Sequence, residues 1–89
     1  MVVIVEIMPK QGILDPQGKA VNQALHHLGF DSVSDVKVGK IIRLEMTDSE
    51  IETARGKAED MARRLLHNSN VESFKVVIPQ VDPAFRGER

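Results

Sequence analysis

The 89-residue sequence has no cysteine, tryptophan or tyrosine, and only three phenylalanines. Without cysteine the chain can form neither a disulfide nor a thiolate metal site, a composition that fits a reducing compartment. Sheets that bind RNA or single strands usually stack bases on aromatic side chains, which are scarce here. The hydrophobic core must therefore be aliphatic.

An excess of one charge and a long apolar run are also lacking. The 12 basic and 13 acidic residues are interspersed, which argues against the broad basic surface of a nucleic-acid binder. No apolar run approaches the roughly 20 residues of a membrane span. Glu6 interrupts the apolar start, which has no basic region typical of a signal peptide. We expect a cytoplasmic protein that binds neither nucleic acid nor membrane.

The first third of the chain predicts a strand and a well-delimited helix. Residues 2–8 are rich in β-branched side chains and end at Pro9. Asp15 suits the N-cap of a helix that starts at Pro16, and Gly29 suits its C-terminal stop. The apolar face of this helix is expected to comprise Val21, Ala24, Leu25 and Leu28.

The remainder predicts three more strands and a second helix. Strands are expected at 33–38, 41–46 and 72–78, the first two joined by a type II′ hairpin at Gly39-Lys40. Ser49 and Glu52 form a capping-box pattern before the second helix. Its buried face is expected to comprise Ile51, Ala54, Ala58, Met61 and Leu65.

The order β-α-β-β-α-β predicts an α+β, ferredoxin-like domain over residues 1–79: a four-stranded antiparallel sheet with two helices on one face. Residues 80–89 have little periodicity and are expected to be a tail that is flexible or ordered by a partner. The first strand is apolar on both faces, and a monomer seldom exposes a large apolar patch. We therefore expect a homodimer, or a tetramer, that covers the open face of the sheet or joins its edges.

No pattern in the chain predicts catalysis, cofactor binding or a metal site. The glycines from Gly12 miss the phosphate-binding loop, because Gly18 is six positions on and Ala20 replaces its hydroxyl residue. His26 and His27 are adjacent on a helix and point in different directions, so no cluster has metal-ligand spacing. No Ser/His/Asp or Cys/His arrangement is identifiable.

Three runs together resemble the PurS family: GILDPQGKAV (12–21), ALHHLGF (24–30) and VSDVKVGK (33–40). The resemblance spans residues 2–78 and implies the small subunit of phosphoribosylformylglycinamidine synthase, a carbon–nitrogen ligase of purine biosynthesis. It implies a non-catalytic subunit that bridges a large synthetase subunit and a glutaminase subunit and supports ammonia transfer. It also implies that ATP and magnesium belong to the large subunit, so that this one carries no cofactor.

Two further expectations follow from this reading. Gln17, Lys19 and Lys40 are the polar residues of the matching block that folding explains least, and they are candidate partner contacts. The alternative function is a small-molecule sensor of the ACT type, which shares the predicted topology.

Overall fold

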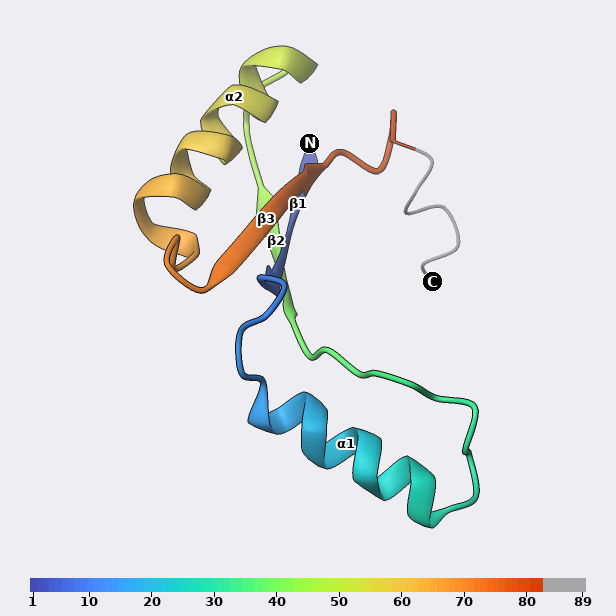
Figure 1. Cartoon of the computed structure of the whole chain (residues 1–89). Helices are drawn as coiled ribbons and strands as arrows, with labels where there is room; N and C mark the ends of the chain where they lie inside the picture. Colours follow the sequence, from blue (N-terminus) through green and yellow to red (C-terminus); the bar gives the residue numbers. More distant parts are fainter. Residues whose placement is uncertain (83–89) are drawn as a thin grey trace.

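The computed structural model describes residues 1–82 as a three-stranded sheet with helices (Figure 1). The elements are β1 (Val2–Pro9), α1 (Pro16–His27), β2 (Lys40–Glu45), α2 (Ile51–Met61), the π-helical turn η1 (Ala62–Leu66) and β3 (Glu72–Val77). The sheet is antiparallel, with strand order β2-β1-β3. The predicted α+β class is confirmed, with three strands rather than four among the described residues.

The central strand β1 carries the core. Its side chains alternate between the two faces of the sheet, and Val3, Val5 and Ile7 are at most 1% exposed. They meet one side of α2 and η1, where the small residues Ala54, Ala58 and Ala62 are fully buried. Ile4 points to the other face and is only 7% exposed, which confirms that β1 is apolar on both faces.

The predicted buried face of the second helix is wrong at its C-terminal end. Met61 and Leu65 are 37% and 83% exposed, while Ala62 and Leu66 pack on the core. Positions 58, 62 and 66 continue one i, i+4 row across the wide π turn, so the buried stripe lies one residue further along than predicted. The capping box is also wrong, because Glu50 is the N-cap residue and forms no side-chain cap bond.

Helix α1 has the predicted ends. The Gly18 amide donates to Asp15 at 3.1 Å, and Pro16 occupies the first helical position. Gly29 has φ +95°, and the Phe30 amide donates to the Leu25 carbonyl at 3.0 Å, as in a Schellman motif.

The predicted position of α1 over the sheet is wrong for the single chain. The helix lies beyond the end of the sheet (Figure 1), and its apolar residues Val21 and Leu28 are 40% and 73% exposed. Among the described residues, α2 and the η1 turn that follows it cover one face of the sheet, and α2 packs on β1 and β3. The radius of gyration, 15.7 Å, accordingly exceeds the roughly 12 Å of a compact domain of this length.

The predicted strand 33–38 and its hairpin are wrong as well. Residues 34–39 have no strand partner among residues 1–82, and they continue directly into β2. Gly39 does not have the positive φ that a type II′ turn requires. A two-residue hairpin would also pair Val38 with Ile41. That register would set the charged Lys37 opposite Ile42, whose partner Val5 faces the helix side of the sheet. The predicted turn would therefore place a charged side chain on the apolar side.

Instead, residues 11–39 form a unit of their own, which we call the arm. Asp15 joins its two halves, because one carboxylate oxygen caps α1 and the other accepts the Val38 amide at 3.0 Å. At the far end His26 Nε2 lies 2.7 Å from the Val33 carbonyl, to which it donates. A Cβ at Gly18 would overlap the Val36 carbonyl, so only glycine allows this approach of helix and chain.

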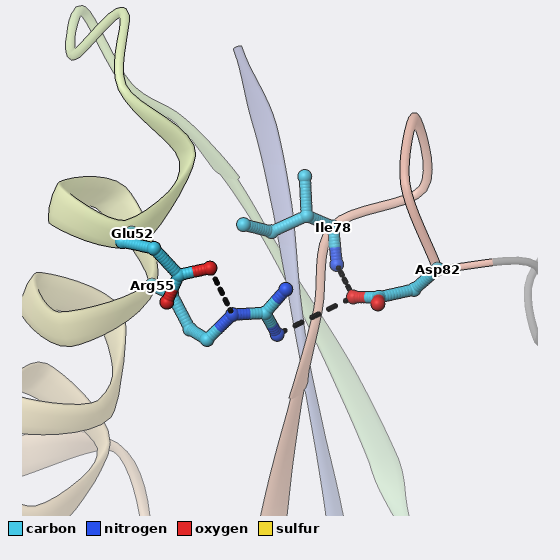
Figure 2. Close-up of polar contacts among 4 residues, drawn as sticks. All are labelled: Glu52, Arg55, Ile78 and Asp82. Carbon is cyan, nitrogen blue, oxygen red and sulfur yellow. Dashed lines mark hydrogen bonds and ion pairs between the residues drawn. The ribbon is translucent and has the colours of Figure 1, made fainter.

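The end of β3 is fixed to α2 by the Asp82 carboxylate (Figure 2). It accepts the Ile78 amide at 2.7 Å and lies 3.4 Å from Arg55, which also approaches Glu52 at 3.7 Å. These contacts hold the pKa of Asp82 below its usual range, with the Ile78 hydrogen bond as the largest cause. The predicted tail therefore begins with an ordered turn over residues 80–82, and residues 83–89 lie outside the described part.

Two helical glycines should respond in opposite directions to alanine. Nothing lies within 4 Å of a Cβ built at Gly56, so Gly56→Ala should raise the free energy of unfolding by about 0.5–1 kcal/mol. Gly18→Ala should lower it by about 1–3 kcal/mol, because the methyl group overlaps the Val36 carbonyl. Urea denaturation at one protein concentration measures both. Equal effects of the two substitutions would contradict the close approach within the arm.

The Asp15 link should weaken at acid pH. Hydrogen bonds from Val38 and Gly18, in that order, lower the pKa of Asp15 below 3.8. A lowered folded-state pKa stabilises the fold above the unfolded-state pKa of about 3.9, and this contribution is lost as pH falls through the folded-state value.

Asp15→Asn should remove that acid-dependent part of stability. Its amide oxygen can still cap Gly18, but its NH2 group then faces the Val38 amide. Melting temperatures of both proteins between pH 7 and pH 3 should converge as pH falls. An unchanged gap between them across this range would count against the link.

Candidate functional site

The candidate partner contacts lie around the junction of arm and sheet. Gln17 and Lys40, far apart in the sequence, line one hollow of about 230 Å³. Its other lining residues are Ile7, Pro9, Val38, Gly39 and Glu72. Residues from β1, α1, β2 and β3 thus meet where the arm leaves the sheet. The backbone at Gly39 lies close to β1 at this hollow, because a Cβ there would overlap the Ile7 carbonyl.

Lys19 lies in a different hollow, also of about 230 Å³, between α1 and the returning chain of the arm. Asp15 and Asn22 line it too, and the side-chain oxygen of Asn22 is buried without a hydrogen-bond partner in the described structure. The three predicted residues therefore do not form one site. Gln17 and Lys40 come together, and Lys19 is separate.

Lys40 also borders a wider hollow of about 530 Å³ on the open side of the sheet. Glu6, Met8, Lys37, Gly39 and Ile41 complete its lining. Sequence reasoning missed Glu6 and Lys37 as surface features. The signal for Glu6 was present, since it is the one charged residue in an otherwise apolar strand.

This junction has the chemistry of a contact surface. It presents two ammonium groups, the carboxylates of Glu6 and Glu72, and apolar side chains. Within residues 1–82, no three His, Cys, Asp or Glu side chains gather closely enough to hold a metal ion. Over the same residues, no helix has the length and apolar character needed to cross a membrane.

Comparison with known proteins gives one consistent family. The model of the PurS family, described as phosphoribosylformylglycinamidine (FGAM) synthase, matches residues 2–80. The PurS subunit of FGAM synthase from Bacillus subtilis is 34% identical over 74 residues, covering 81% of this chain and 84% of the relative. That from Methanocaldococcus jannaschii is 29% identical over 73 residues, covering 82% and 88%.

Solved structures agree. The crystal structure of M. jannaschii PurS has a TM-score of 0.76 at 30% identity and covers 85% of this chain and 92% of its own. A chain of the Thermotoga maritima PurLQS structure has a TM-score of 0.77, covers 85% and 93%, and, at 24% identity, shows the shared fold alone. The chain therefore belongs to the PurS family, the small subunits of phosphoribosylformylglycinamidine synthase.

Proposed function

We propose that this chain is a non-catalytic, cytoplasmic scaffold subunit of a phosphoribosylformylglycinamidine synthase in purine biosynthesis. It bridges a large synthetase subunit and a glutaminase subunit and supports the transfer of ammonia from glutamine to formylglycinamide ribonucleotide. In this proposal ATP and magnesium belong to the large subunit, and this chain carries no cofactor. The observation that carries this proposal is the family match over residues 2–80, nearly the whole described chain.

The relatives and the junction both support a role in assembly. The Thermotoga maritima structure whose fold this chain shares is of PurLQS, which names PurS together with PurL and PurQ. The junction of arm and sheet offers charged and apolar groups for contact with other subunits, among them Gln17 and Lys40 in one hollow. Lys19 presents a third exposed polar side chain on the arm.

A homodimer is part of this proposal. Helix α1 and its C-cap expose Val21 and Leu28, and η1 exposes Leu65 at 83%. Apolar surface of this extent on a single chain favours association, because its burial removes it from water. The outer edges of β2 and β3 have no strand partner within residues 1–82 and offer backbone groups for the same purpose.

Reconstitution tests the scaffold role. Large and glutaminase subunits are assayed for synthase activity with and without this chain, first with glutamine and then with ammonium chloride as the nitrogen source. We expect the chain to be required with glutamine and much less so with ammonium, since added ammonia bypasses the transfer. Equal glutamine-dependent activity in its absence would reject the proposal.

Charge reversal at the junction tests the contact surface. Lys40→Glu should raise the concentration of this chain needed for half-maximal glutamine-dependent activity by about tenfold, which corresponds to about 1.4 kcal/mol. Arg63→Glu makes the same charge change at an exposed position in η1 and serves as the control. The mass of each variant in solution is measured by light scattering, so that a lost dimer is not mistaken for a lost contact. Equal effects of the two reversals would remove Lys40 from the contact surface.

A further inference from the structure

The open face of the sheet, turned away from α2, is covered at one end and bare at the other. It carries Ile4 and its cross-strand partner Val77, which are only 7% and 1% exposed. At the opposite end of the same face Met8 and Ile41 are both exposed. The cover therefore lies at the end of the sheet where β3 stops.

No helix or strand within residues 1–82 provides this cover, because α2 and η1 pack on the helix-facing side. The neighbouring side chains on the open face are themselves in solvent. Arg43, opposite Ile4, keeps 63% of its side chain exposed, and Lys75, beside Val77 in β3, is exposed as well. Such complete burial of two apolar side chains on one sheet face requires a further layer on top of them.

The chain itself leaves β3 on this side. After Ile78 it turns away from α2 (Figures 1 and 2), and residues 79–82 form a tight turn in which the amides of Val81 and Asp82 both donate to the Ile78 carbonyl. The Asp82 carboxylate fixes this turn through the Ile78 amide and Arg55. Because Val81 remains exposed, the turn sets the direction of the chain and supplies little of the cover.

We infer that residues 83–89 fold back over the open face as a strap, with the Phe85 ring on Ile4 and Val77. The segment reads PAFRGER, and Phe85 is its only large apolar side chain. Three residues beyond the anchored Asp82 span at most about 10 Å, or roughly two strand spacings, so Phe85 can reach β1 from the end of β3. An aromatic ring is also large enough to cover both side chains at once.

The charges of the segment fit the same face. Glu6 follows Ile4 on the open side of β1, and it forms no ion pair with a basic side chain within residues 1–82. Arg86 and Arg89 bring two cations, the first of them directly after Phe85 in the sequence. An ion pair at an exposed site adds little stability, so the ring holds the strap and the charges orient it.

The strap gives the open face an occupant from within the chain. It accounts for the apolar open side of β1 without a second copy stacked on that side. The strand edges and α1 remain for the homodimer of the proposed function. The strap itself does not depend on the other synthase subunits.

Phe85→Trp tests the strap in the whole 89-residue chain, which has no tryptophan or tyrosine of its own. The indole should be shielded from solvent, so acrylamide should quench its fluorescence several-fold less than that of Gln80→Trp, whose position in the turn is exposed. Unfolding in urea should remove this difference. An indole at position 85 that is quenched as readily as one at position 80 in the folded chain would overturn the strap.

A disulfide identifies the face that the segment contacts, because the chain has no cysteine of its own. Mild oxidation of V77C/F85C should join the two thiols within one chain. The product should run as a monomer on a non-reducing gel and, once denatured, resist labelling by a maleimide-linked polyethylene glycol. V76C/F85C moves the first thiol to the helix-facing side and should be labelled. Covalent dimers of V77C/F85C, or equal labelling of the two variants, would show that no intrachain strap forms.

The strap and the proposed function fail separately. Fluorescence and crosslinking of this chain alone report the strap, whereas reconstituted glutamine-dependent activity reports the scaffold role. A shielded indole in a Phe85→Trp chain, together with a parent chain that does not support synthase activity, would overturn the scaffold role and leave the strap standing. An unshielded indole with full activity of the parent chain would overturn the strap alone. Circular dichroism shows that each variant is folded.

Discussion

The sheet is organised by the pairing of β1 on both of its sides. Because β1 lies between β2 and β3, its backbone groups are bonded along both edges, and its alternating side chains can be apolar on both faces. Val3 and Val5 then require a cover, which α2 provides through Ala54 and Ala58. The small alanines allow the helix to approach the strand closely, and Asp82 ties the end of β3 to the same helix through Arg55.

The sequence predicted the parts of this fold that local interactions decide. Asp15 and Pro16 mark the start of α1, and Gly29 its end, because capping depends on residues only a few positions apart. The apolar pattern of β1 also identified it as a central strand. The capping box at Ser49 failed since Glu50 takes the N-cap position, a one-residue difference that composition alone does not resolve.

The arm could not be predicted in the same way. Its helix and its β-branched segment were recognised, but their position depends on whether the chain turns at Gly39 or runs straight through it. The glycine at position 39 locally favours a turn. A two-residue turn there, however, would set the polar Lys37 opposite the apolar Ile42 on one face of the sheet. The meeting of Gln17 and Lys40 in one hollow likewise depends on tertiary structure, and so does the separation of Lys19 from them.

The internal hydrogen bonds of the arm have a consequence for the thermodynamics of assembly. Asp15 and His26 fix the helix and the returning segment against each other before any partner arrives. Ordering the backbone of one residue costs roughly 1–2 kcal/mol in conformational entropy, so a preorganised arm spares association most of that cost. These two contacts span 23 and 7 residues and so close shorter loops than the strand pairs of the sheet do, which favours the arm as a small recognition unit that forms before the sheet.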